Sequence, residues 1–263
     1  MIRSQNQIEC YPDLHRLLRG ANRSCRVLDV GCGAGWFIHS VARYYALGAV
    51  GIDLSEGALQ RARRVSGMLG VSALTRFLRL DLFDAPSLPD RFFLVNTLGA
   101  LHHTFDCSRA LRRVAPWVQD GGYLHLGLYH RHGRRPFLDL FRGYRERVER
   151  AVSEEERMTV EREAFALYRQ LNAEILDERF LFSWFRDQVF HPYESHHTVE
   201  EVHGWLDELG FQCLTTSINR FQPVEDWKLI FQEEEKMYDI SYHRNHIQRV
   251  YFPGFFTLLA RRR

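Results

Sequence analysis

The stretch VLDVGCGAGWF, residues 27–37, constrains the fold of this chain more than any other. Apolar and β-branched residues precede its glycines and a helix-like run follows, so the glycines lie at a strand-to-helix turn. Backbone N–H groups and the helix dipole at such a turn favour a bound polar or anionic group. A dinucleotide site has the spacing G-x-G-x-x-G. Here Gly31, Gly33 and Gly35 form G-x-G-x-G, and Trp36 occupies the place of the third small residue, which argues against a nicotinamide dinucleotide.

Three acidic residues accompany the first three expected strands in order. Asp29 lies in the first strand, Asp53 ends the second (AVGIDLS) and Asp81 follows the third (FLRLDLFD). An acid at the end of the second strand can accept hydrogen bonds from both hydroxyls of a ribose. This ordered set, D-x-G-x-G, then an acid, then Asp-Leu, resembles the class I S-adenosylmethionine-dependent methyltransferases.

The resemblance implies a cofactor and the residues that bind it. The glycine loop would contact the methionine end of S-adenosylmethionine, Asp53 the ribose, and Asp81 with Leu82 the adenine edge. The full set of expected cofactor-binding residues is Asp29, Gly31, Cys32, Gly33, Asp53, Leu54, Asp81, Leu82 and Asn96. The product of the expected reaction is S-adenosylhomocysteine.

Strand and helix patterns alternate through the first half of the chain, which predicts a parallel sheet covered on both faces. Strands are expected at Arg26–Val30, Ala49–Asp53, Arg76–Leu80, Phe92–Asn96, Gly122–Tyr129, Gly210–Ile218 and in the last stretch, FFTLLAR. Helices are expected near Trp36–Leu47, Glu56–Leu69 and Asp106–Trp117. Together with the resemblance, these elements predict an α/β fold, a doubly wound, mostly parallel, Rossmann-like sheet of seven strands with a helical lid insertion.

The insertion comprises residues 130–197, which carry helical rather than strand periodicity. Ser153 and Glu156 form a capping box for one of its helices, and Thr198 and Glu201 form another just beyond it. Inserted segments of this length are usually lids or binding elements. The expected organisation is therefore a cofactor-binding core of residues 1–129 and 198–263, with a lid or substrate insertion between them.

The stretch VNTLGALHHTFD, residues 95–106, follows the fourth expected strand and resembles the fourth motif of small-molecule methyltransferases. The family commonly has an acid early in this strand, where this chain has Phe93. Asn96, at the strand tip, is expected to place its amide near the transferring methyl group. His102 and His103 are candidate general bases, because imidazole can accept a proton near neutral pH. The alternative is that both histidines begin the next helix and bond to the backbone.

A second group of candidates lies at the exit of the insertion, in WFRDQVFHPYESHHT, residues 184–198. Its polar side chains are those of Asp187, Gln188, His191, Glu194, His196 and His197. His191 is the preferred base for the methyl acceptor, because the proline that follows it restricts its backbone. Asp187 or Glu194 would orient the ring, and His196 is an alternative base. The same residue types can ligate a metal or simply solvate a loop, but no recognised ligand spacing is present, so no metal is expected.

The first part of the insertion is basic. Between Arg131 and Arg150 seven arginines stand against Asp139, Glu146 and Glu149, a net charge of 7 − 3 = +4. An acidic group on a substrate would suit this segment. The simpler interpretation is a solvated helix face whose arginines pair with the acids at residues 154–156.

Composition limits the remaining possibilities. The chain has 263 residues, 45% of them hydrophobic, which suits one globular domain with an insertion. The net charge of +2 is too small to indicate electrostatic attraction to nucleic acid or to a membrane. Five cysteines without a C-x-x-C pair argue against a disulfide framework and for a reducing cytosol. The N-terminal stretch lacks the apolar run of a signal peptide, and no apolar run approaches the ~20 residues of a membrane span.

We therefore expect a cytoplasmic S-adenosylmethionine-dependent methyltransferase that acts on a small-molecule acceptor, with no nucleic acid or membrane partner. The reaction would be an in-line displacement of methyl from a sulfonium by a nucleophile that the protein aligns and, where needed, deprotonates. The alternatives are an RNA or protein methyltransferase and a protein that binds S-adenosylmethionine without turnover.

Overall fold

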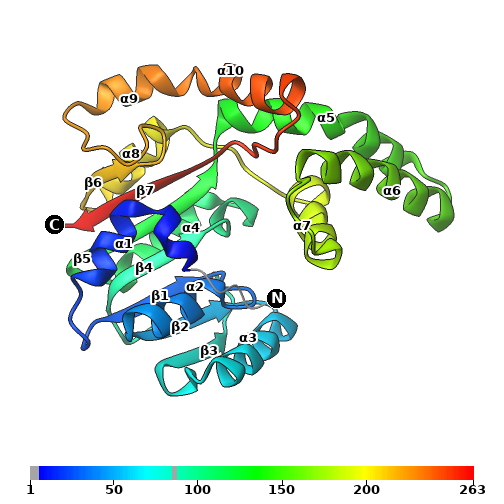
Figure 1. Cartoon of the computed structure of the whole chain (residues 1–263). Coiled ribbons are helices and arrows are strands. Elements are labelled where there is room, and N and C mark those ends of the chain that lie inside the picture. Colours follow the sequence, from blue (N-terminus) through cyan, green and yellow to red (C-terminus); the bar gives the residue numbers. More distant parts are fainter. Residues whose placement is uncertain (1–5, 85–87) are drawn as a thin grey trace. The chain divides into compact units, whose positions relative to one another are not determined.

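The computed structural model describes residues 6–84 and 88–263, and its chain divides into two compact units (Figure 1). Unit 1 comprises Met1–Leu128, Glu200–Trp227 and Phe256–Arg263, and unit 2 comprises Tyr129–Val199 and Lys228–Phe255. The sequence predicts that all of residues 198–263 belong to the core. In the structure, residues 228–255 instead form part of unit 2, because their helices pack against the helix that opens the insertion.

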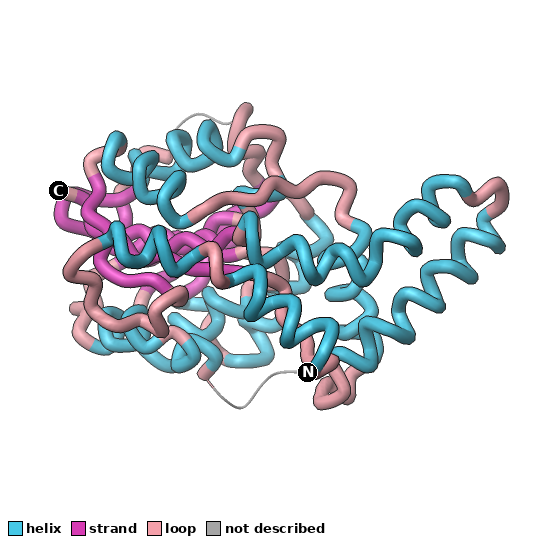
Figure 2. Tube along the Cα trace, turned by 90° about the horizontal axis from the view of Figure 1, so that it is seen from above, coloured by secondary structure: helices cyan, strands magenta, loops and turns pink. Residues whose placement is uncertain are grey.

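One sheet of seven strands forms the centre of unit 1, with the strand order β3-β2-β1-β4-β5-β7-β6. The strands are β1 Arg26–Val30, β2 Gly48–Asp53, β3 Thr75–Arg79, β4 Phe92–Leu98, β5 Val118–Tyr129, β6 Phe211–Thr216 and β7 Phe255–Arg262. β1 to β5 pair with one another in parallel, and β6 pairs with β7 antiparallel. Figure 2 shows the strands as a layer flanked by helices. The predicted doubly wound, mostly parallel fold is confirmed.

The strand order indicates where the sheet would bind a ligand. β1 pairs with β2 on one side and β4 on the other, so the order reverses at β1. In open α/β sheets, ligands bind beyond the carboxyl ends of the strands at such a reversal. The glycine loop follows β1 directly, which puts it at this position.

The helices of unit 1 include the three expected from the sequence there, of which α3 has the predicted bounds. They are α1 Pro12–Arg19, α2 Trp36–Ser40, α3 Glu56–Leu69, α4 Cys107–Val114 and α8, which runs from Val199 to Glu208. Ser55 caps α3 by accepting a hydrogen bond from the Ala58 N–H, and Gly70 ends it with a φ of 69°. The helix expected near Trp36–Leu47 is α2, which continues as a π-helical segment over Val41–Tyr45.

Unit 2 is helical, as predicted for the insertion. Its helices are α5 Arg131–Arg150, α6 Glu154–Leu171, α7 Glu178–Phe190, α9 Trp227–Glu234 and α10 Met237–Tyr242, which continues as a π-helical segment to Ile247. A core of aromatic and aliphatic side chains joins α5, α6 and α7: Phe137, Phe141, Ala164, Tyr168, Leu171, Leu181, Phe185 and Val189. The insertion begins and ends at paired residues, since His130 and His197 form a parallel β-bridge.

The capping box predicted at Ser153 and Glu156 forms in part. The Ser153 hydroxyl accepts from the Glu156 N–H at 3.1 Å, as predicted, while the Glu156 carboxylate accepts from the Val152 N–H rather than from that of Ser153. At the start of α8 the Val199 N–H donates to the Glu234 carboxylate at 2.6 Å. Within residues 6–84 and 88–263, no helix is both long and apolar enough to cross a bilayer.

Candidate active site

The glycine loop of unit 1 is a backbone cradle fixed to the neighbouring strand. Gly31, Gly33 and Gly35 have φ values of 72°, 52° and 83°. The N–H groups of Gly31 and Cys32 donate to the Ile52 carbonyl oxygen at 2.9 and 3.0 Å. A Cβ on Gly31 would lie 2.3 Å from the Ala100 Cβ, so this position excludes any side chain, whereas a Cβ on Gly33 would meet nothing within 4 Å. The space above Gly33 is therefore open to a ligand.

Asp53, at the end of β2, is hydrogen-bonded to this loop. Its Oδ2 accepts from the Gly33 N–H and its Oδ1 from the Ser55 N–H, both at 2.8 Å. A carboxylate oxygen has more than one acceptor site, so both oxygens can still accept from the hydroxyls of a ribose. The next residue, Leu54, is 60% exposed. The end of β2 can thus present a fixed carboxylate and an apolar side chain to a nucleoside.

Asp81 and Leu82 lie two and three residues beyond the end of β3. Asp81 Oδ1 accepts from the Phe83 N–H at 2.9 Å, and the Leu82 carbonyl accepts from Arg113 Nε at 3.1 Å. The Phe83 ring packs on that of Phe105 with centroids 4.2 Å apart. The sequence analysis missed this pair, although an aromatic residue directly after the Asp-Leu dipeptide was a visible signal.

A row of three buried polar side chains crosses the middle of the sheet. Asp29 on β1, Asn96 on β4 and His125 on β5 are register partners in turn. Asn96 Nδ2 donates to Asp29 Oδ1 at 2.7 Å, and its Oδ1 therefore accepts from His125 Nδ1 at 2.8 Å. The Asn96 amide, expected near the transferring methyl group, is hydrogen-bonded through both its nitrogen and its oxygen within the sheet. These bonds join β1, β4 and β5.

Burial perturbs both ionisable members of this row. It raises the pKa of Asp29 to about 7, against the hydrogen bond from Asn96, which lowers it. Burial lowers the pKa of His125 to about 4, against the Asp13 carboxylate, which raises it. The sequence analysis missed His125, whose only signal was a lone histidine in the otherwise apolar run YLHLGLY.

His102 and His103 form the turn that follows β4, within the short 3-10 helix Leu101–His103. Their rings pack edge to face with centroids 4.3 Å apart. His102 is fully buried, whereas His103 is only half-buried. Of the two candidate bases in unit 1, His103 is the more exposed.

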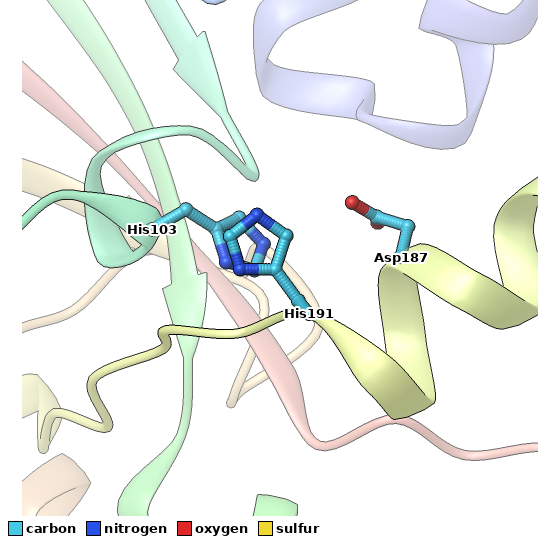
Figure 3. Close-up of side chains that lie close together, drawn as sticks. All are labelled: His103, Asp187 and His191. Atoms are coloured by element: carbon cyan, nitrogen blue, oxygen red, sulfur yellow. The ribbon is translucent and has the colours of Figure 1, made fainter. Parts of the chain in front are cut away.

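In unit 2, Asp187 lies on α7 and His191 at the end of that helix (Figure 3). His191 Nδ1 lies 2.6 Å from the Tyr193 carbonyl oxygen, to which it donates. Asp187 is exposed, and its Oδ2 accepts from Gln188 Nε2 at 3.2 Å. The local turn thus fixes the orientation of the His191 ring through the backbone of the residues that follow it.

Glu194 orients His196. Glu194 Oε1 lies 2.7 Å from His196 Nε2, and both carboxylate oxygens accept from the fully buried Arg134, at 3.0 and 2.7 Å. Burial raises the pKa of Glu194, but the hydrogen bonds from His196 and Arg134 outweigh it and hold the pKa well below its usual range. The carboxylate is therefore ionised at neutral pH, and His196 donates to it through Nε2.

Arg134 is the centre of a buried network that the sequence analysis missed. Besides Glu194, it donates through Nη2 to the Gln188 carbonyl at 2.7 Å and through Nη1 to the Pro253 carbonyl at 3.3 Å. Its guanidinium lies 3.6 Å from the centroid of the Tyr129 ring. Gln188 and Glu194, predicted as site residues of the exit segment, are thus bound to the start of α5.

The sequence and the fold are similar to those of known methyltransferases. Residues 27–122 match the family model described as "Methyltransferase domain". An uncharacterized protein from Synechococcus is 29% identical over 214 residues, which are 75% of this chain and 50% of that protein. A ubiquinone biosynthesis O-methyltransferase from Neisseria meningitidis is 35% identical over 114 residues, 43% of this chain and 45% of that enzyme. The chain matches about half the length of these curated relatives.

Solved structures share the fold. An S-adenosylmethionine-dependent methyltransferase from Mesorhizobium loti aligns over 100% of both chains with a TM-score of 0.54 and 22% identity. Magnesium protoporphyrin IX methyltransferase from Synechocystis, solved with bound S-adenosylhomocysteine, aligns over 98% of this chain and 83% of its own, with a TM-score of 0.57 and 15% identity.

The sequence matches and the fold define the class of the domain that unit 1 contains. Residues 27–122 match a methyltransferase domain, and the chain has the fold of the class I S-adenosylmethionine-dependent methyltransferases. S-adenosylmethionine is the methyl donor of this family. The family match ends at residue 122, so unit 2 lies outside it.

Proposed function

We propose that this protein transfers the methyl group of S-adenosylmethionine to a nucleophilic atom of a small-molecule acceptor. The observation that best supports this proposal is the hydrogen bond from the Gly33 N–H to the Asp53 carboxylate. Gly33 belongs to the glycine loop, and the space above it is open. Curated relatives named as ubiquinone biosynthesis O-methyltransferases support a small organic acceptor.

The residues of unit 1 fit S-adenosylmethionine. Asp53 would accept from the ribose hydroxyls, the backbone of Gly31–Gly33 would contact the methionine end, and Asp81 with Leu82 would contact the adenine. Leu54 and the exposed Phe105 ring offer apolar surface for the base. When bound, the cofactor supplies an activated methyl group on a sulfonium. The protein then aligns the acceptor, excludes water and removes a proton where the acceptor is a hydroxyl or carbon acid.

We propose a histidine of the exit segment as that base. His196 is half-buried and bonded to an ionised carboxylate, the arrangement that orients an imidazole and stabilises its cation. His191 is the second candidate, with a ring fixed by the Tyr193 carbonyl. His103 is the alternative in unit 1. We propose that Asp187, which is exposed on α7, contacts the acceptor.

Calorimetric titration with S-adenosylmethionine tests the binding assignment. Asp53→Asn removes the charge that strengthens two ribose hydrogen bonds, so affinity should fall about tenfold or more. Asp90→Asn is the matched control, because Asp90 is a surface carboxylate that pairs only with Arg26 in the described part of the chain. Equal affinity of the folded Asp53→Asn protein and the wild type would refute the assignment.

A labelling experiment tests the class of acceptor. Cell extract is separated into small molecules, RNA and protein, and each fraction is incubated with the enzyme and S-adenosylmethionine labelled on its methyl group. We expect label in the small-molecule fraction, with Asp53→Asn reducing it. Label confined to RNA or protein would contradict the proposed acceptor class.

A further inference from the structure

One face of α5 forms the floor of a groove in unit 2. The groove has a volume of about 690 Å³ and is lined by Arg131, Arg135, Arg142 and Arg145 of α5. These positions are spaced i, i+4, i+11 and i+14, which places the four guanidinium groups along one side of the helix. The opposite side of α5 carries Phe137 and Phe141, which are fully buried in the aromatic core. The arginine side is therefore the outer side of the helix.

Part of this positive charge is not neutralised by neighbouring acids. Asp139 and Glu146, which also line the groove, pair with Arg142 and with Arg150, respectively. Arg135 and Arg145 form no ion pair with any residue that the structure describes. The guanidinium groups of these two arginines can accordingly bind an anion without first breaking an ion pair.

The start of α5 brings two of these arginines together at one end of the groove. Arg131 and Arg135 lie one turn apart there, at the positive end of the dipole of a 20-residue helix. His196, from the exit segment, lines the same groove. All three lining acids, Asp139, Glu146 and Glu149, lie further along the helix. An anionic group is thus best stabilised between Arg131 and Arg135.

One aromatic side chain, that of Tyr238, also lines the groove. Tyr238 belongs to α10 and is 38% exposed. Its ring is nearly parallel to that of Tyr242, at 12° with centroids 6.4 Å apart, and Tyr242 stacks on His246 in the same way at 4.6 Å. Because Tyr238 lines the groove and is partly exposed, a planar group of a ligand can pack against its ring.

We propose that this groove binds a small molecule that joins a planar ring to a carboxylate or phosphate group. The anion would lie between Arg131 and Arg135, and the ring against Tyr238. A nucleic acid fits less well, because its continuous phosphates would meet the acids along the rest of the groove. The proposal goes beyond methyl transfer, since it concerns unit 2 alone and holds whether or not the ligand is the acceptor.

Calorimetry with phenyl phosphate, benzoate and phenol tests the proposal. At about 0.15 M salt, at least one of the two anions should bind measurably and phenol should not, and the better anion identifies the group that the groove prefers. Arg135→Gln should weaken that anion about tenfold, a typical loss for one charge-assisted hydrogen bond. Arg179→Gln is the matched control, because Arg179 lies on α7 outside the groove. Tyr238→Ala should weaken phenyl phosphate more than inorganic phosphate.

Three results would overturn the proposal. One is that neither anion binds more tightly than phenol. The second is that Arg131→Gln and Arg135→Gln both bind the anions as tightly as the wild type does. The third is that a short RNA displaces the bound anion and itself loses affinity in both variants. Circular dichroism, measured on every variant, shows whether the helices of unit 2 remain folded.

Discussion

The two units hold their polar groups in different ways. In unit 1 the candidate cofactor site depends mainly on the backbone: glycine N–H groups, strand ends and one carboxylate bonded to main-chain donors. In unit 2 the candidate residues depend on side chains that meet from distant segments, as when Arg134 binds Glu194, 60 residues further along the chain. A site of the first kind leaves a compact sequence motif, whereas a site of the second kind does not.

The largest effect should come from breaking the network of unit 2 at Arg134. Arg134→Ala leaves the buried Glu194 carboxylate without its main partner, and removal of one member of a buried ion pair costs about 3–5 kcal/mol. Arg147→Ala is the control, because it breaks the exposed pair with Glu163, which should cost below about 1 kcal/mol. Urea unfolding of the two variants measures the difference. Equal losses of unfolding free energy in the two variants would contradict a stabilising role for the buried Arg134 network.

A smaller effect is expected where two glycines of unit 2 meet. A Cβ on Gly254 would lie 2.1 Å from the Gly133 carbonyl carbon, at a φ of +65°. Gly254→Ala should therefore lower the free energy of unfolding by about 3 kcal/mol, near the upper limit for overpacking. Gly143→Ala, in the middle of α5 with nothing within 4 Å, should instead raise it by about 0.4–1 kcal/mol. An unchanged free energy of unfolding for Gly254→Ala would contradict a close contact between Gly254 and the Gly133 backbone.

In unit 1, the pH dependence of stability should depend on the buried row. Between about pH 4 and 7 folded Asp29 keeps a proton that the unfolded chain releases, so its contribution falls as pH rises. Between about pH 4 and 6.5 the unfolded chain binds a proton that folded His125 lacks, so its contribution rises with pH. The two slopes oppose each other in the wild type.

Single substitutions should separate these slopes. In Asp29→Asn, His125 is the member of the row that still titrates. The free energy of unfolding should therefore rise with pH from 4 to 6.5, by up to about 1.4 kcal/mol per pH unit. In His125→Gln, Asp29 is the member of the row that still titrates, so the free energy of unfolding should fall over the same pH range. Thermal unfolding at half-unit steps of pH measures both. Parallel pH profiles for the two variants would contradict the opposed titrations.

The fold and the cofactor loop could be predicted because local chemistry determines them. Strand β1 and helix α3 have the predicted bounds, and the other strands of the sheet differ from prediction by a few residues at their ends. The D-x-G-x-G loop was identifiable because only glycine fits a turn with φ near +72° and Ala100 in contact at Gly31.

The remaining features depend on pairs that are far apart in sequence. His130 bonds to Glu234, 104 residues away, and this contact helps to place residues 228–255 in unit 2 rather than in the predicted core. Glu194 was expected to orient His191, but the buried guanidinium of Arg134 and the ring of His196 bind both of its oxygens. No periodicity or spacing encodes such pairs, so the roles in unit 2 were less predictable than those in unit 1.

The most direct test of the account separates cofactor binding in unit 1 from acceptor chemistry in unit 2. Affinity for S-adenosylmethionine and the rate of methyl transfer to the acceptor identified by labelling are measured for His196→Ala, His191→Ala, His102→Ala and His103→Ala. We expect His196→Ala or His191→Ala to keep the affinity and lose about 10²–10⁴-fold in rate. Full rates in both of these variants, with a loss in His102→Ala or His103→Ala, would contradict the account and place the base in unit 1.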